Sequence, residues 1–495
     1  MASFVLGGHE LALATGTGIS GTTLPPLAGT ESKAHLATDT QVGAVSAQTA
    51  GLHTSLARTS AVAATGAAHD ARPVRALSGG RTPTRVTYVN VDGTQTKRTY
   101  LVSHFYKVGG AWKTVDDSIV ADPAKPPPAA PALSGFAPPA ALLAPRAVYS
   151  VTGNDWQAHF APSDFAGGMV RITQGSDEIG FVPVGAASVD PAVSQDSTGQ
   201  QVVRYDDVWP GVSLVYVVNG DSLKESIVLR TAAAQHEVAF RIIGATLRAD
   251  PTRDPAAPAF HIDGRLGDTF AISKVALLLS RFGYVTDAQP VTQRYADGLL
   301  SISVDPTYLR KLPPAAFPAS VDPSVYRSPF GSRAGGNYVS FKTDGYICYS
   351  NVCNLYAGSL YDQNWNLQWW RGAFFSPYDI FRDPNVIMGH ANLHLTQRSN
   401  ESFWTGTWDG HTFQLGHATC LNSFNCVDGV WSQAYFGGAG DIDATNLYQS
   451  MISGGDFGAW MMLMGEDGSD SSFKNFDPDN TFVDFTYTNK PDPAA

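Results

Sequence analysis

The chain has 495 residues, a formal net charge of −11 at pH 7 and only 16 % charged residues. That length accommodates about two to four domains of about 100–200 residues each. The acidic, sparsely charged composition argues against nucleic acid as a partner, because such binding needs clustered Lys and Arg. Glycine (48), proline (31) and 11 % aromatic residues are typical of short strands and turns. This composition predicts an all-β protein of several β-sandwich domains. No apolar run reaches the roughly 18 residues of a membrane-spanning helix, so we predict no transmembrane segment.

The N-terminal residues differ in texture from the rest of the chain. Residues 1–80 are rich in Ala, Thr, Ser and Gly and show no sustained hydrophobic period. This composition buries too little apolar surface to offset the entropy lost on ordering, so we predict a disordered leader. Phe4–Ala14 has some apolar character, but His9-Glu10 interrupts it and no Lys or Arg precedes it, which is not typical of a secretion signal.

From residue 81 onward, short apolar runs alternate with turn residues. We predict a β segment at 81–120, a proline-rich extended connector at 121–147 and a middle β domain at 148–330. A C-terminal β-sandwich follows at 337–490, and it contains all four cysteines and seven of the ten tryptophans. Regularly spaced short strands of this kind are typical of stacked antiparallel sheets.

The clearest local pattern is a β-hairpin within Tyr205–Leu229. Val212–Val218 is a β-branched and aromatic run, and Leu223–Leu229 is a second apolar-rich run. Asn219-Gly220-Asp221 joins them with residues that tolerate positive φ, which is the strongest short-range hairpin signal.

Two further predictions concern this hairpin. Trp209-Pro210-Gly211 forms a turn that leads into the first strand. Lys224 and Glu225 are adjacent, so on a strand they point to opposite faces and cannot act as a pair.

The cysteines form two close pairs, Cys348/Cys353 and Cys420/Cys426. Their even number and restriction to one region favour disulfides and an oxidising compartment. Free thiols and a four-cysteine zinc site are the alternatives, although zinc sites usually have two residues between paired cysteines, and here there are four and five. Three pairings are possible, and the sequence does not choose between them.

Tryptophans of the last segment are candidate ligand-binding residues. Trp365, Trp369 and Trp370 lie close together, and Trp404 and Trp408 flank a glycine turn. An exposed indole is a flat apolar platform on which a sugar ring can stack, whereas buried tryptophans fill a core. On a strand Trp369 and Trp370 must point to opposite faces, so at least one faces solvent or a neighbouring domain.

Acidic residues also gather in the last segment and are candidate calcium ligands, because hard cations need several oxygen atoms. The four that we select are Asp441, Asp443, Glu466 and Asp467. Turn formation is the alternative role, since none matches an EF-hand spacing. Glu466 and Asp443 are also the carboxylates that a glycosidase interpretation would pair. His390 and His394 have a spacing that suits zinc on a helix, but their strand-like surroundings place them about 13 Å apart.

Several motifs, taken together in their order along the chain, resemble the N-terminal region of secreted Rhs/YD-repeat proteins (polymorphic-toxin and wall-associated), including the DNRLRE-type β-sandwich. The motifs are Tyr88–Thr94 with Trp112–Asp116, the hairpin Tyr205–Leu229, Phe317–Pro323, Ile442–Thr445, Gly465–Phe476 and Phe482–Tyr487. Together they span roughly residues 85–489. The literal DNRLRE signature and the YD repeats are absent from the chain.

The resemblance implies an extracellular or cell-surface β module, without enzymatic activity, for display, adhesion or delivery. A surface polysaccharide or another protein is the expected partner, and no cofactor is expected besides a structural calcium ion. Two alternatives belong to other classes: a secreted polysaccharide-active enzyme with two converging carboxylates, and a structural filament subunit that associates through edge strands.

Overall fold

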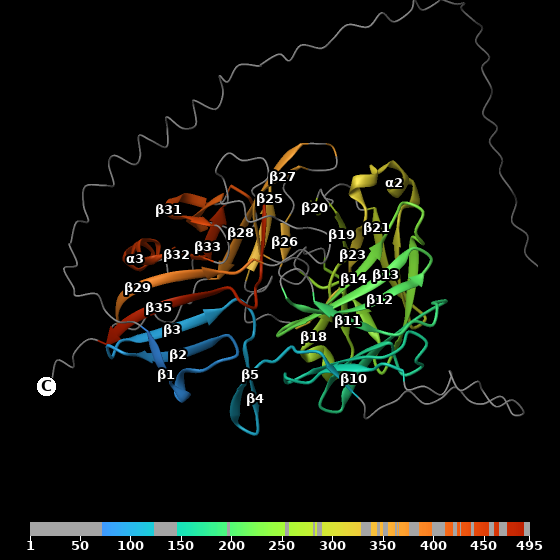
Figure 1. The fold of residues 1–495 in the computed structure, drawn as a ribbon, viewed down its shortest axis with the longest axis horizontal. Coiled ribbons are helices and arrows are strands. Elements are labelled where there is room, and N and C mark those ends of the chain that lie inside the picture. Colours follow the sequence, from blue (N-terminus) through green and yellow to red (C-terminus); the bar gives the residue numbers. More distant parts are fainter. Residues whose placement is uncertain are drawn as a thin grey trace, which may run out of the picture. The chain divides into compact units, whose positions relative to one another are not determined.

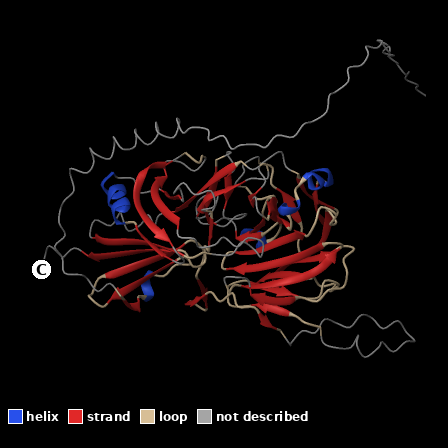
Figure 2. Ribbon diagram, turned by 45° about the horizontal axis from the view of Figure 1, so that its top comes forward, coloured by secondary structure: helices blue, strands red, loops and turns tan. Residues whose placement is uncertain are grey.

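The computed structural model describes residues 72–122, 146–195, 199–252, 257–280, 283–284, 290–327, 338–343, 347–349, 355–361, 364, 366–375, 386–397, 411–418, 423–425, 427–436, 440–454, 460–464 and 473–489. Strands dominate these residues, and every strand pair among them is antiparallel, so the predicted all-β class is confirmed (Figure 2). The described helices are α2 (Pro306–Lys311) and α3 (Thr445–Gly454), with 3₁₀ turns at Ser78–Gly80, Arg265–Asp268 and Pro314–Ala316.

The first β-sandwich is built from two large sheets (Figure 1). Sheet 1 has the order β21-β22-β15-β10-β9-β8-β7-β6, with β6 (Val120–Ala121), β7 (Tyr149–Val151), β8 (Gln157–Phe160), β9 (Val170–Gln174), β10 (Asp177–Pro183), β15 (Glu237–Ile243), β21 (Val291–Ala296) and β22 (Leu299–Val304). Sheet 2 has the order β11-β12-β13-β14-β24-β18-β17-β16, with β19, β20 and β23 joined through β14, and its strands are β11 (Ala192–Gln195), β12 (Gln201–Trp209), β13 (Val212–Asn219), β14 (Ser222–Leu229), β16 (Leu247–Ala249), β17 (Phe260–Ile262), β18 (Phe270–Ile272), β19 (Ala276–Leu279), β20 (Gly283–Tyr284), β23 (Ala319–Asp322) and β24 (Val325–Arg327). Alternate side chains of both sheets share one hydrophobic core, which is the arrangement of a sandwich.

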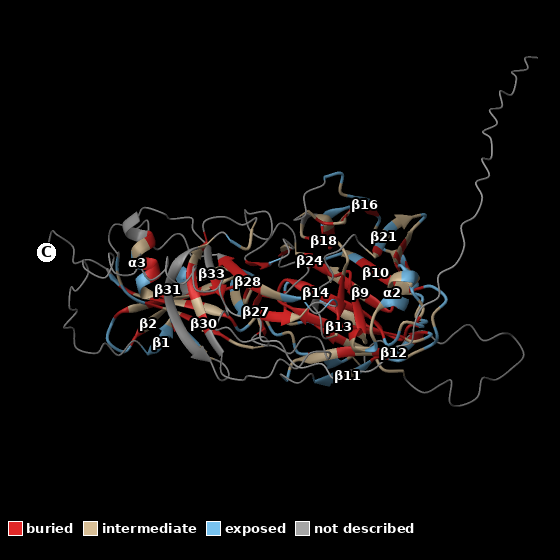
Figure 3. Ribbon diagram, turned by 90° about the horizontal axis from the view of Figure 1, so that it is seen from above, coloured by how far each residue is buried: buried red, intermediate tan, exposed pale blue. Residues whose placement is uncertain are grey.

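The predicted hairpin is confirmed as β13 and β14, and it lies in the interior of sheet 2 (Figure 3). All residues of both strands are buried. The turn at Pro210-Gly211 is also confirmed, with Gly211 at φ 73°.

Gly220 has a different role from the one predicted. It is not among the described residues with positive φ; instead, a Cβ at this position would lie 2.0 Å from the Ser103 carbonyl oxygen. The glycine therefore permits a close backbone approach.

Lys224 and Glu225 point to opposite faces of the hairpin, as predicted. Glu225 accepts a hydrogen bond from the Tyr216 hydroxyl at 2.5 Å within the sandwich core, whereas Lys224 Nζ lies 3.9 Å from Asp322 Oδ2 on the other face. Both side chains are buried. A strand can hold such polar groups inside only where each has a partner.

The second sandwich combines chain segments from both ends of the described chain. Sheet 3 has the order β1-β2-β3-β35-β29-β32, with β1 (Pro73–Ala76), β2 (Arg85–Asn90), β3 (Gln95–Tyr100), β29 (Val386–Leu395), β32 (Gly440–Asp443) and β35 (Phe482–Asn489). Sheet 4 has the order β26-β25-β28-β33-β30-β31, with β27 joined to β28 and β34, and its strands are β25 (Tyr338–Lys342), β26 (Ile347–Tyr349), β27 (Leu355–Tyr361), β28 (Leu367–Phe375), β30 (His411–Ala418), β31 (Val427–Phe436), β33 (Trp460–Met464) and β34 (Lys474–Phe476). Their shared core includes Leu393 and Phe485 of sheet 3, Phe374 of sheet 4 and Tyr448 of α3.

Pairing of β3 with β35 joins residues 95–100 to residues 482–487. Residues of the predicted segments 81–120 and 337–490 therefore share one sheet. Regular structure also begins earlier in the chain than predicted. Pro73–Ala76 lies inside the predicted leader 1–80, yet it forms a strand that pairs with β2. Composition does not reveal such long-range pairing, and residues 1–71 lie outside the described part.

No helix among the described residues is long and apolar enough to cross a membrane.

Candidate functional site

Of the tryptophans predicted to bind a ligand, Trp369 and Trp370 lie within the described residues, and Trp365, Trp404 and Trp408 lie outside them. Trp370 is fully buried, and its ring packs edge-on against Tyr356 at a centroid distance of 5.3 Å. Trp369, its neighbour on β28, is half-buried, as the alternation of a strand requires. Trp370 is therefore a core residue, and only Trp369 of this pair is open to a ligand.

The predicted calcium ligands Asp441 and Asp443 are exposed on β32, and Glu466 and Asp467 lie outside the described residues. In the part of the chain that the structure describes, no group of three or more His, Cys, Asp or Glu side chains could hold a metal ion. The two aspartates instead face histidines of β29. The calcium site and the pairing of Glu466 with Asp443 in a glycosidase stay predictions.

Cys348 lies buried in β26 and is disulfide-bonded. Cys353, Cys420 and Cys426 lie outside the described residues, so the connectivity of the four cysteines stays a prediction.

One face of sheet 3 gathers polar and aromatic side chains. On β29 and β35 the residues alternate, so that Leu393 and Phe485 enter the core while their neighbours point outward. We call the opposite side the outer face of sheet 3; its residues are Arg98, His390, Asn392, His394, Asp441, Asp443, Phe482 and Asp484. The neighbouring strands β3, β35, β29 and β32 all contribute to it, so the face is a continuous surface.

The histidines of the outer face are held by polar contacts. His394 Nδ1 lies 2.7 Å from Asp441 Oδ1 on the adjacent strand. His390 Nδ1 lies 2.8 Å from the Thr445 hydroxyl at the start of α3 and 3.8 Å from Asp443 Oδ1. These contacts fix the orientation of both imidazoles and leave the second nitrogen of each ring as a further polar group.

Phe482 begins β35 and lies at one end of the outer face, opposite Tyr100 of β3 and His394 of β29. The imidazole of His394 stacks on its ring with a centroid distance of 4.6 Å and an interplanar angle of 20°. The guanidinium carbon of Arg98 lies 3.8 Å from the same ring centroid. Such cation–π and stacking contacts align the three groups in a row across β3, β35 and β29.

Arg98 is also bound by Asp484. Its Nε and Nη2 donate to the two carboxylate oxygens at 2.8 and 2.7 Å, a bidentate geometry. Burial lowers the pKa of Arg98, but the hydrogen bonds and charge of Asp484 outweigh burial and raise the pKa overall. Arg98 is therefore a permanent cation whose position is fixed.

The aromatic end of the outer face continues beside Arg98. Tyr100 stacks on His104 with a centroid distance of 4.0 Å. Burial, together with the positive charge of Arg98, lowers the pKa of His104, so its imidazole is neutral at pH 7. Burial likewise raises the pKa of Tyr100, which keeps its hydroxyl protonated.

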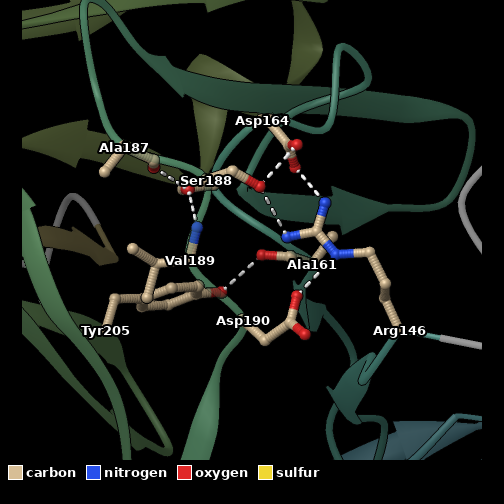
Figure 4. Close-up of polar contacts among 9 residues, drawn as sticks. Arg146, Ala161, Asp164, Ala187, Ser188, Val189, Asp190 and Tyr205 are labelled. Atoms are coloured by element: carbon tan, nitrogen blue, oxygen red, sulfur yellow. Dashed lines mark hydrogen bonds and ion pairs between the residues drawn. The ribbon is translucent and has the colours of Figure 1, made fainter. Parts of the chain in front are cut away.

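A second polar cluster lies on the first sandwich (Figure 4). The guanidinium of Arg146 bonds Asp164 at 2.5 Å, Asp190 at 2.6 Å and the Ser188 hydroxyl at 3.1 Å. Burial raises the pKa of Asp164, but hydrogen bonds from Ser188 and Arg146, with the charge of Arg146, outweigh it and lower the pKa overall. Because Arg146 binds both carboxylates, this cluster joins the segments around Asp164 and Asp190. Nearby, the Tyr205 hydroxyl donates to Ala161 O at 2.9 Å.

Chemically, the outer face offers hydrogen-bond donors and acceptors on neighbouring paired strands. Carboxylates accept, an amide both donates and accepts, and the ring nitrogens of an imidazole are further polar groups. Sugar hydroxyls also donate and accept, and the apolar face of a sugar ring packs on aromatic carbon. The arrangement therefore suits a polyhydroxylated ligand.

Sequence patterns singled out His390, His394, Asp441 and Asp443, but in separate hypotheses about metals. Their contact across β29 and β32 was missed because strand pairing is long-range. Arg98, Phe482 and Asp484 were missed as well. The alternation in Phe482–Tyr487 is the signal that could have placed Phe482 and Asp484 on one face.

No protein-family model matches this chain, and no curated protein matches it. Among solved structures, one match is the crystal structure of an exo-β-1,3-galactanase from Phanerochaete chrysosporium with β-1,3-galactotriose. The identity is 10 %, the match covers 86 % of this chain and 98 % of the galactanase chain, and the TM-score is 0.13. At that TM-score the match carries no argument about fold or function.

Proposed function

We propose that this chain is a non-enzymatic, extracellular β module that binds a carbohydrate at the outer face of sheet 3. The observation that carries the proposal is the row from Arg98 through Phe482 and His394 to Asp441, in which each group is oriented by a neighbour. A preoriented row loses little side-chain entropy on binding, which favours recognition by an exposed face.

The physical character of the face supports binding more than chemistry. Asp441 and Asp484 already bind His394 and Arg98, so neither carboxylate is poised as a free base. The side chains of His394 and Asp441 are 32 % and 56 % exposed, which keeps their remaining polar atoms accessible to a ligand.

The cellular role follows from separate support. The motif order resembles that of secreted Rhs/YD-repeat proteins with a DNRLRE-type sandwich, and Cys348 is disulfide-bonded. Disulfides persist in oxidising compartments. We infer display or adhesion at a cell surface, with the carbohydrate as the anchoring ligand.

A glycan array followed by titration of the best ligand tests the proposal. His394→Ala and Asn392→Ala should each weaken binding about tenfold, the value of roughly 1.4 kcal/mol. The matched control is His236→Ala, an exposed histidine of the first sandwich, which should leave affinity unchanged. Absence of any glycan binding, or equal loss in the control, would contradict the proposal.

A further inference from the structure

The β4–β5 hairpin lies beside the outer face, where the rings of Phe105 and Phe482 both contact Tyr100. β4 (Phe105–Val108) and β5 (Ala111–Thr114) form a two-stranded sheet of their own among the described residues. Figure 1 shows this hairpin projecting from the chain around it. Gly109 and Gly110 form its tip with φ of 57° and 84°, and a Cβ on either would meet no described atom within 4 Å.

The base of the hairpin is anchored. Phe105 is buried in a small cluster with Val86 and Tyr100, and Trp112 packs against that cluster. The guanidinium of Arg81 lies 4.7 Å from the Phe105 ring centroid. The hairpin is thus a fixed projection whose tip is open and whose base is packed.

The hairpin carries two lysines, although the chain as a whole is acidic. Lys107 and Lys113 are both exposed, and within the described residues neither makes an ion pair. Lys107 Nζ lies 5.1 Å from the Trp112 ring centroid, directly across the strand pair, and Lys113 lies across from Tyr106. Each face of the hairpin therefore presents one cation beside one aromatic ring.

We propose that the β4–β5 hairpin is a second binding surface, specific for an anionic polysaccharide that carries carboxylate groups. The exposed ammonium groups of Lys107 and Lys113 can each attract an anion at this projection. The neighbouring aromatic rings supply apolar contact for the sugar ring between its charged groups. Val108 is the only large apolar side chain of the hairpin that is markedly exposed, at 47 %, which is too little apolar surface to anchor a membrane.

This inference does not depend on the carbohydrate site of sheet 3, and its test separates the two. The full chain is titrated with polygalacturonate at low and at physiological salt. We expect binding that weakens as salt is added, because the contact is an exposed charge interaction. The double variant Lys107→Gln/Lys113→Gln should weaken binding about tenfold.

The matched control is Arg310→Gln/Lys311→Gln, which changes the net charge equally at α2 of the first sandwich. It should bind polygalacturonate as the parent chain does. Equal weakening by the α2 control would show attraction without a site and overturn the proposal. Absence of binding by the parent chain, or tighter binding to anionic phospholipid vesicles than to polygalacturonate, would also overturn it.

Discussion

The β13–β14 hairpin and the outer face of sheet 3 contain similar residue types in opposite surroundings. Tyr216 bonds Glu225 inside the first sandwich, and Phe482 and Arg98 contact His394 and Asp484 on an accessible face. Burial of Glu225 raises its pKa to about 8, with the charge of Asp322 adding to the rise and the Tyr216 hydrogen bond opposing it. On the outer face, partners hold the carboxylates while water still reaches them. The same kinds of contact are buried in one place and reach solvent in the other, and exposure makes the difference.

Trp370 and Trp369 are neighbours on β28 that differ in burial. Trp370→Ala should destabilise the chain by about 3–5 kcal/mol, because it opens a cavity beside Tyr356 and Phe473. Trp369→Ala should cost much less, since that side chain is only half-buried. Denaturant unfolding of both variants is the measurement; similar losses would show that exposure does not separate the two roles.

Glu225→Gln should change how stability depends on pH. A carboxyl whose pKa is raised by folding binds its proton more tightly in the folded chain, so its contribution is complete below about pH 4.5 and is lost as pH rises through about 8. The parent chain should thus lose stability relative to the Gln variant, by a few kcal/mol, between pH 5 and 9. Thermal unfolding of both chains across that range measures the difference. A constant difference would mean that Glu225 does not titrate in this window.

Asp484→Asn should have a smaller effect on stability. It leaves the partly buried Arg98 without its carboxylate and should cost roughly 1–2 kcal/mol. The matched control is Asp206→Asn, whose partner Arg204 and own side chain are more exposed, so its loss should be under about 1 kcal/mol. Chemical denaturation measures the free energy of unfolding of both variants. A larger loss of stability for Asp206→Asn would contradict the expectation that the less exposed Arg98–Asp484 pair contributes more.

His394→Ala should have the smallest effect on stability, below about 1 kcal/mol, because the imidazole is partly exposed and its bond to the exposed Asp441 is made at the surface. The glycan affinity should nevertheless fall about tenfold. Unfolding and titration of the same variant separate the two effects. A large loss of stability would show that the face is structural.

Local patterns in the sequence predicted the all-β class and the hairpin well. Val212–Val218 and Leu223–Leu229 lie close together in the chain with Asn219-Gly220 between them, so two apolar runs and a turn are visible without the fold, although Gly220 serves a close backbone approach and not a positive φ. The opposed directions of Trp369 and Trp370 follow from strand geometry alone.

The candidate site was only partly predictable, because it depends on contacts between distant segments. Arg98 meets Asp484, and His394 meets Asp441, across sequence separations of 386 and 47 residues. No local period encodes those pairings. Composition also missed β1, whose order comes from pairing with β2 and not from its own apolar content.

A crystal structure of the chain with the tightest oligosaccharide from the glycan array tests the central claim most directly. The account predicts sugar density on the outer face of sheet 3, within hydrogen-bond distance of His394 and Asn392. Density over Trp369, at the β4–β5 hairpin alone, or elsewhere on the first sandwich would contradict it.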